Sequence, residues 1–183
     1  MTSLPDELTI ASDLVTLRDW QDADAPALAA VCGDPEITSF TTVPERYSRD
    51  AALGWIERQK DMRMTGKGLV LAIEPPGHGV AGNVNLVRFS ADGSSAAMGY
   101  WVVRQKRGRG YARSAAAALC EWGFAELGLR TIEFAIAGAN PASIAVALAV
   151  GASYDGVELI TPIHESEPRE FGVYRLHASD RRE

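Results

Sequence analysis

A short basic segment rich in glycine is the part of the chain best suited to chemistry. Residues 104–112 read Arg-Gln-Lys-Arg-Gly-Arg-Gly-Tyr-Ala and lie between an apolar run and an alanine-rich stretch typical of a helix. Two glycines let the backbone turn with its N–H groups pointing one way, and the following helix adds free N–H donors and the positive end of its dipole. Arg104, Arg107 and Arg109 add mobile positive charge. The segment therefore predicts a loop that binds phosphate groups.

The segment departs from two well-known phosphate loops. A P-loop carries Gly-Lys followed by Ser or Thr at the start of its helix, whereas Tyr111 and Ala112 follow Gly110 here. A dinucleotide-binding loop needs a third Gly or Ala at the position of Arg113. Glu133 lies about 20 residues further on, where a ribose-binding acid is expected, so this alternative stays open beside an ordinary turn with a basic rim.

Length and composition favour one domain over 1–183, with its core at about 14–176 and tails at 1–13 and 178–183. The chain has 183 residues and is 46% apolar, which suits a single two-layer core. Its net charge of −6 argues against a general nucleic-acid surface, because phosphate backbones bind basic faces. We therefore expect an anionic ligand at the basic loop and no nucleic-acid partner.

Cysteine content and hydropathy predict a cytoplasmic protein. Cys32 and Cys120 are the two cysteines, and they lie far apart in apolar surroundings without metal-ligand spacing. We expect both to be buried packing residues in a reducing compartment, with no metal site. The N-terminus lacks the basic start and apolar core of a secretory signal. No apolar run reaches the ~18 residues of a membrane span, so no membrane partner is expected.

Hydrophobic periodicity and turn residues predict alternating strands and helices. The Asp92-Gly93 pair is a hairpin signal, so the strands around it should form an antiparallel meander. Strands are expected at 14–20, 69–73, 80–88, 98–103, 131–137, 154–161 and 171–176, and helices at 24–32, 48–66, 111–127 and 140–151.

This order of elements resembles the GNAT family of N-acetyltransferases, in particular the branch that acetylates the N-termini of ribosomal proteins. The resemblance covers about 14–176 and implies an α+β fold. Its mixed sheet would be mostly antiparallel, splayed open, built of about six or seven strands and flanked by about four helices. The features at the family's spacing are Gln105-x-x-Gly108-x-Gly110, the preceding Gly99-Tyr100-Trp101, and Asn140-Pro-Ala-Ser143 with Gly151 beyond it.

The resemblance also implies acetyl-CoA as cosubstrate, held in the gap between the strand ending near 103 and the strand at 131–137. Strands that part leave backbone groups unpaired, and the amide chain of pantetheine can pair with them. The implied contacts are the backbone of Val102, Val103 and Arg104 for pantetheine, the N–H groups of Gly108, Arg109, Gly110, Tyr111, Ala112 and Arg113 for the pyrophosphate, and the Asn140 side chain near the cysteamine end.

The implied reaction is direct attack of a neutral amine on the thioester, followed by departure of the CoA thiolate. The family often carries a tyrosine that protonates this thiolate, and this chain has Ala147 at that position. The resemblance therefore assigns the role to Ser143. The competing interpretation of Ser143 is a residue of the first helical turn with a capping function.

The general base is harder to place. Many relatives carry a glutamate in the strand before Gly99, and this chain has Ala97 there. Glu133 is the catalytic candidate that remains, holding a water in place, although strand alternation puts it opposite its apolar neighbours and an exposed structural role is equally open. Other groups near the acceptor region are individually typical of a surface: Glu158, His164, Glu165, Glu167, Glu170 and His177.

The missing base favours a weakly basic acceptor. At pH 7 an α-amine with a pKa of about 7.8 costs ~1 kcal/mol to neutralise, whereas a lysine amine near 10.4 costs ~4.6 kcal/mol. We expect an amine-bearing acceptor, either a peptide or protein N-terminus or a small molecule, in a pocket built from 36–47 and 161–171. The transferred group could also be larger than acetyl, such as succinyl.

Two other functions stay in view. A non-catalytic CoA-binding or interaction module is the second hypothesis, and a nucleotide-binding oxidoreductase is the third. The apolar segment 144–150 indicates either a buried helix or a homodimer contact.

Overall fold

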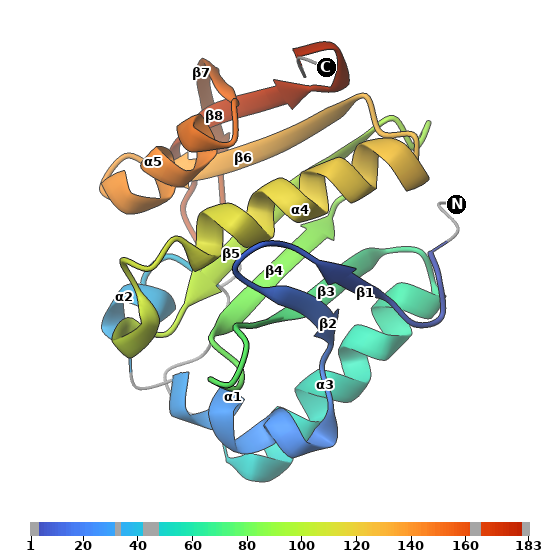
Figure 1. Ribbon diagram of the computed structural model, residues 1–183. Helices are drawn as coiled ribbons and strands as arrows, with labels where there is room; N and C mark the ends of the chain where they lie inside the picture. Colours follow the sequence, from blue (N-terminus) through green and yellow to red (C-terminus); the bar gives the residue numbers. More distant parts are fainter. Residues whose placement is uncertain (1–3, 32–33, 42–47, 162–165, 181–183) are drawn as a thin grey trace.

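One sheet organises the computed structural model, which describes residues 4–31, 34–41, 48–161 and 166–180 (Figure 1). The described strands lie in the order β1-β2-β3-β4-β5-β6-β8-β7. Neighbouring strands are antiparallel except β5 and β6, which are parallel. The strands are β1 (Thr9–Ala11), β2 (Thr16–Asp19), β3 (Gly68–Glu74), β4 (Gly82–Val87), β5 (Ser95–Val102), β6 (Thr131–Ala137), β7 (Ser153–Ile160) and β8 (Arg169–His177).

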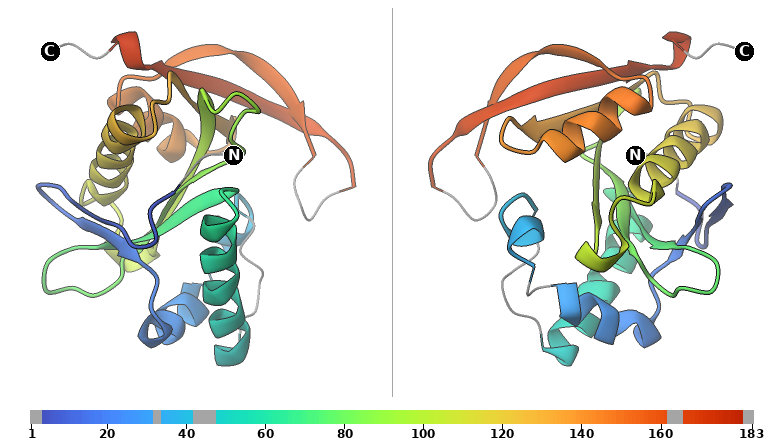
Figure 2. Two further views of the ribbon diagram at one scale, coloured as in Figure 1. Left: turned by 90° about the vertical axis from the view of Figure 1, so that its right-hand side faces the viewer. Right: turned by 60° about the vertical axis from the view of Figure 1, so that its left-hand side comes forward.

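Helices cover both faces of this sheet. One face carries α1 and α3, and the other carries α4 and α5 (Figure 1, Figure 2). The short α2 follows α1 in the chain. The helices are α1 (Ala25–Val31), α2 (Pro35–Thr38), α3 (Arg49–Met64), α4 (Tyr111–Glu126) and α5 (Pro141–Ala149), with single 3-10 turns at Asp22–Asp24, Arg104–Lys106 and Ala178–Asp180.

Strand β3 shows why the two helix layers stay in place. Its side chains alternate between faces: Leu69, Leu71 and Ile73 join the core beneath α4, whereas Val70 and Ala72 join the core beneath α1 and α3. A strand buried on both faces needs an apolar run without polar alternation, and this one has it. At about 25 cal/mol per Å² of apolar surface, such central strands supply much of the driving force for folding.

The predicted order of strands and helices is confirmed, with two additions. β1 lies in the segment predicted as an N-terminal tail and pairs with β2, so the described sheet has eight strands where six or seven were expected. α2 was not predicted, because four residues are too few to show a helical period. No helix in the described ranges has both the length and the hydropathy that crossing a membrane requires.

Candidate active site

β5 and β6 run together for only part of their length. They pair through Ser95↔Thr131, Ala96↔Ile132 and Ala97↔Glu133. Beyond these pairs β5 continues beside β4 as far as Val102, and β6 continues beside β8 as far as Ala137. Over this stretch, each of the two strands therefore has one edge that no other described strand pairs with. Backbone N–H and C=O groups at such an edge need hydrogen-bond partners, and an extended amide chain can supply them.

The N-terminus of α4 has the geometry of an anion site. Gly110 occupies the N-cap position with φ +80°, and no side chain caps the helix. The hydrogen bond from the Ser114 N–H to the Gly110 carbonyl is one of the first in the helix, which leaves the preceding N–H groups of the first turn without helical acceptors. Gly108 has φ +73°, and a Cβ built there would meet nothing within 4 Å. These uncapped donors and the open space beside them fit a pyrophosphate.

One predicted phosphate ligand has other partners. The Arg107 guanidinium binds Asp34 at 2.6 Å and also Glu36, both at α2, and its Nε donates to the Val102 carbonyl at 2.9 Å. The expectation of mobile positive charge at Arg107 is therefore wrong for this structure. Because the Val102 carbonyl is one of the groups expected to meet pantetheine, Arg107 links that strand end to α2.

Lys106 is also engaged by the backbone, because its Nζ donates to the carbonyls of His78, Gly79 and Val80 in the turn before β4. Burial lowers the pKa of Lys106, with a smaller contribution from the nearby Arg109. Arg109 itself is exposed in the loop. The cationic side chains of this loop that keep an exposed position are therefore Arg104 and Arg109.

The start of α5 brings three polar groups together. The Asn140 side chain caps the helix through Oδ1, which accepts from the Ser143 N–H at 3.1 Å. The Ser143 hydroxyl donates to the Tyr100 oxygen at 3.0 Å, and the Tyr100 hydroxyl donates to the Ser143 carbonyl at 2.9 Å. Burial raises the pKa of Tyr100 to about 12, so its phenol stays protonated.

Tyr100 was not predicted as a site residue. Strand alternation could have indicated it, because Tyr100 lies on the same face of β5 as Met98 and Val102, which pack beneath α4. What the sequence does not reveal is its partner, since Ser143 lies 43 residues away along the chain.

Glu133 lies directly beside Ala97, the position at which the family resemblance implied a base. The Arg175 Nε and Nη2 atoms both donate to its Oε2, at 3.1 and 2.9 Å. Arg175 also binds Glu158 at 3.1 Å and Asp155. No partner for the Glu133 Oε1 occurs in the part of the chain that the structure describes. The carboxylate is thus held by one oxygen, and the other is available.

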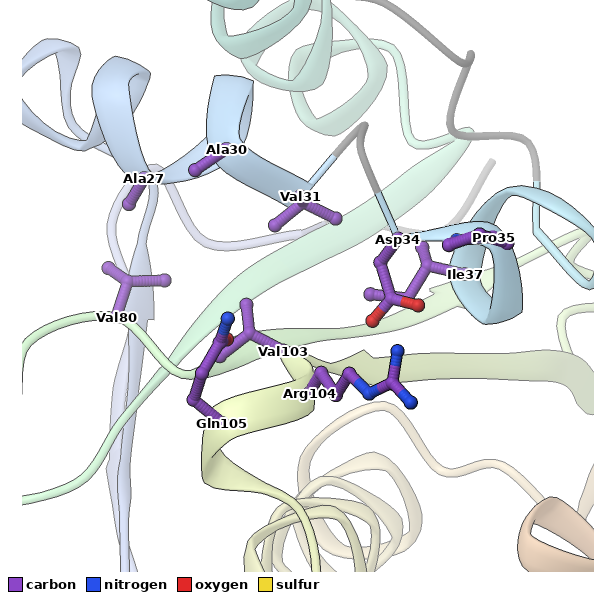
Figure 3. Close-up of a pocket in the computed structure, with 10 residues that line it drawn as sticks. All are labelled: Ala27, Ala30, Val31, Asp34, Pro35, Ile37, Val80, Val103, Arg104 and Gln105. Carbon is purple, nitrogen blue, oxygen red and sulfur yellow. The ribbon is translucent and has the colours of Figure 1, made fainter.

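A cavity of about 470 Å³ lies between α1, α2 and the segment that follows β5 (Figure 3). Its walls are mainly apolar. Asp34 contributes a carboxylate that Arg107 neutralises, and Arg104 contributes a guanidinium. The lining residues are Ala27, Ala30, Val31, Asp34, Pro35, Ile37, Val80, Val103, Arg104 and Gln105.

Other predicted residues are placed as follows. Cys120 is buried, as expected, whereas α5 is not a buried helix, since Ala147 alone is fully enclosed among its residues. His177 contacts Thr131, and Glu167 and Glu170 are exposed. Cys32, His164, Glu165 and much of the expected acceptor segments 36–47 and 161–171 lie outside the described residues.

Comparisons with known proteins agree with this geometry. Residues 15–153 match the family model described as an acetyltransferase (GNAT) domain. The uncharacterized N-acetyltransferase p20 of Bacillus licheniformis is 25% identical over 167 residues, covering 91% of this chain and 93% of that protein. Mycobacterium smegmatis RimJ in complex with CoA-disulfide is 20% identical with a TM-score of 0.84, covering 97% of this chain and 89% of that one. RimL, solved with coenzyme A, is 17% identical with a TM-score of 0.83, covering 95% and 100%.

Fold and site together define an acyl-CoA-dependent acyltransferase with a splayed mixed sheet. The chain belongs to the GNAT acetyltransferase family, and acetyl-CoA is its acyl donor. The predicted family and enzyme class are confirmed. The nucleotide-binding oxidoreductase hypothesis is wrong.

Proposed function

We propose that this acetyltransferase acts on an amine of low basicity, either the α-amine of a peptide or protein N-terminus or a weakly basic amine of a small molecule. The observation that carries the proposal is Ala97, which is only 6% exposed and leaves β5 without a carboxylate at the splay. Its neighbour Glu133 is bound to Arg175. Because the Glu133 carboxylate is occupied by Arg175, an acceptor that is already largely neutral at pH 7 is favoured.

The binding roles rest on the uncapped start of α4 and on the edge of β5 beyond its pairs with β6. The N–H groups from Gly108 to Arg113 would hold the pyrophosphate. The N–H groups of Val102 and Arg104 would pair with the pantetheine arm, whereas the predicted contact at Val103 would need a rearrangement, because its N–H donates to the Ala81 carbonyl and its C=O accepts from the Lys106 N–H. The Asn140 Nδ2 is a donor left over after Oδ1 has capped α5, and it would bind near the cysteamine end. Acetyl-CoA supplies the activated thioester.

Two side chains would take part in proton transfer. The free Glu133 Oε1 would hold a water that takes the proton of the attacking amine, and the Ser143 hydroxyl would donate toward the departing sulfur. RimL is described as a ribosomal α-N-protein acetyltransferase, which agrees with an α-amine acceptor. The cavity beside α1 and α2 would receive the part of the acceptor that follows its amine.

The test compares two peptides of one sequence, with acetyl-CoA as donor. The first has a free N-terminus and no lysine, and the second has a blocked N-terminus and one internal lysine. We expect kcat/KM to be at least tenfold higher for the free N-terminus at pH 7, because lysine is protonated there. Faster turnover of the lysine peptide would refute the proposed acceptor. Binding of acetyl-CoA without turnover of any amine would favour the non-catalytic module.

Matched variants test the role of Glu133. Glu133→Gln and Glu158→Gln each remove one carboxylate that binds Arg175, but Glu133 alone lies beside Ala97. We expect Glu133→Gln to lower kcat, while Glu158→Gln leaves kcat nearly unchanged. Equal effects of the two variants would assign Glu133 a structural role.

A further inference from the structure

Two hydroxyl groups meet where the two parts of the sheet separate. Tyr100 extends from β5, three residues beyond the last pair that β5 makes with β6, and Ser143 extends from α5, which packs on β6. Their two hydrogen bonds, of 2.9 and 3.0 Å, join the opposite sides of the gap. The Tyr100 ring packs edge-on against Phe134 of β6, with ring centroids 6.4 Å apart. The phenol therefore has a fixed position.

The direction of these hydrogen bonds limits what Ser143 can do. A hydroxyl has one proton and two acceptor sites. Tyr100 gives its proton to the Ser143 carbonyl and receives the Ser143 proton on its own oxygen. The Asn140 cap meanwhile holds the Ser143 backbone. The Ser143 hydroxyl thus donates to Tyr100 in this structure. One rotation about the Ser143 Cβ–Oγ bond would point its proton elsewhere.

We propose that Tyr100 is a positioning residue that orients the Ser143 hydroxyl toward the departing thiolate of the acyl donor. This inference rests on the proposed function, in which Ser143 donates to that sulfur. As the amine nitrogen bonds to the carbonyl carbon, the C–S bond breaks and its electron pair goes to sulfur. The Ser143 proton turns toward the sulfur, and the Tyr100 proton turns from the Ser143 carbonyl to the Ser143 oxygen. The proton that the nitrogen loses goes to the water held by Glu133 and from there to solvent, and Ser143 regains from solvent the proton that it gives to sulfur, so the pair ends each turnover unchanged.

The state of the phenol agrees with this role. A buried Tyr100 that remains protonated to about pH 12 is a hydrogen-bond donor throughout the working range of an enzyme. The Tyr100–Ser143 pair also accounts for Ala147, the position at which the family resemblance implied a tyrosine. Its side chain is fully buried and carries no hydroxyl. The hydroxyl implied at position 147 of α5 would here be replaced by the Ser143 hydroxyl of α5, oriented by Tyr100 of β5.

The first test uses Tyr100→Phe, which removes one oxygen and keeps the ring against Phe134. Tyr154→Phe is the matched control, because Tyr154 is 59% exposed at the start of β7 and its ring packs edge-on against Tyr174. With acetyl-CoA and an N-terminal amine, we expect Tyr100→Phe to lower kcat about tenfold or more, as loss of oriented proton donation does. The Kd for acetyl-CoA should be unchanged, and Tyr154→Phe should match the wild type. Unchanged kcat in Tyr100→Phe would overturn the inference.

The second test varies the leaving group. S-nitrophenyl thioacetate releases a thiol that is a far stronger acid than CoA, so its departure needs little assistance. With this donor, we expect the ratio of the wild-type kcat to the Tyr100→Phe kcat to fall toward one. An equal loss with both donors would show that Tyr100 acts elsewhere and would overturn the inference.

A double-mutant cycle with Ser143→Ala completes the design. If Tyr100 acts through Ser143, Tyr100→Phe adds no further loss of kcat in the Ser143→Ala background. Additive losses would contradict the inference. The proposed function fails separately, by absence of wild-type turnover with every amine, whereas an active wild type with an unaffected Tyr100→Phe variant removes this inference alone.

Discussion

The two parts of the sheet, β1–β5 and β6–β8, differ in how far helices bury them. β3 and its neighbours are buried on both faces, between α4 on one side and α1 with α3 on the other. β7, at the far edge, exposes Tyr154, Val157 and Leu159 to extents of 59, 53 and 70%. The β7–β8 pair reaches beyond the helices (Figure 2). The contrast separates the scaffold, a part that is buried on both faces and carries the cofactor loop, from the open part, an edge that is open to solvent.

The largest expected effect separates scaffold from open part directly. Leu71→Ala removes a fully buried side chain and should lower the free energy of unfolding by about 2–5 kcal/mol. Leu159→Ala makes the same chemical change on the exposed edge and should shift it by less than about 0.5 kcal/mol. Denaturant unfolding of both variants measures the difference. Similar losses would mean that β7 is covered in solution, as a homodimer contact would require.

A second pair of variants tests whether the scaffold end near α4 binds the cofactor. Gly108 and Gly128 have φ of +73° and +66°, and in both an added Cβ meets nothing within 4 Å. Alanine at either position should cost about 1–2 kcal/mol of stability, through left-handed backbone strain alone. Only Gly108→Ala should also weaken acetyl-CoA binding, by about tenfold, because the added methyl group would enter the open space that fits the pyrophosphate. Isothermal titration calorimetry of both variants with acetyl-CoA measures this difference. Equal affinities would contradict a role of Gly108 in binding the pyrophosphate.

A third comparison concerns two arginines of one loop. Arg107→Ala breaks the contacts to Asp34 and Glu36, so it should cost about 1 kcal/mol of stability and raise the KM for the acceptor, with little change in acetyl-CoA affinity. Arg109→Ala should do the opposite, leaving stability intact and weakening acetyl-CoA binding a few-fold. Steady-state kinetics with both substrates varied provides the measurement. A large loss of acetyl-CoA affinity in Arg107→Ala would show that Arg107 leaves α2 to bind phosphate.

The last comparison is a pH dependence at the junction of the two parts. In the folded protein the Tyr100 pKa is about 12, against 10.0 for an ordinary tyrosine. Between these values the unfolded chain loses the proton while the folded protein keeps it, so stability present below pH 10 is lost as the pH rises toward 12. Tyr100→Phe lacks this contribution. Its free energy of unfolding should therefore fall less than that of the wild type over the same range, and parallel curves would contradict the assigned environment.

Local features were predictable from the sequence, and long-range contacts were not. The apolar run at 69–73, the glycines of the cofactor loop and the alternation around Glu133 each follow from neighbouring residues. Arg107 was misjudged because its carboxylate partners lie more than 70 residues earlier in the chain. The pairing of Tyr100 with Ser143 was not predicted for the same reason, since Ser143 lies on another element. The ion pairs of Arg175 likewise depend on β8 lying between β6 and β7.

The brief pairing of β5 with β6 has a consequence for how such enzymes diversify. Among the described strands, β5 and β6 pair only from Ser95 to Ala97 and from Thr131 to Glu133, and the Arg130 and Thr131 N–H groups donate to the Ser94 carbonyl just before these pairs. A recombination point placed there disturbs little of the buried register on either side. We expect chimeras that exchange everything after Glu133 for the same portion of a relative to fold on the unchanged scaffold and to keep the acceptor preference that the cavity beside α1 and α2 sets.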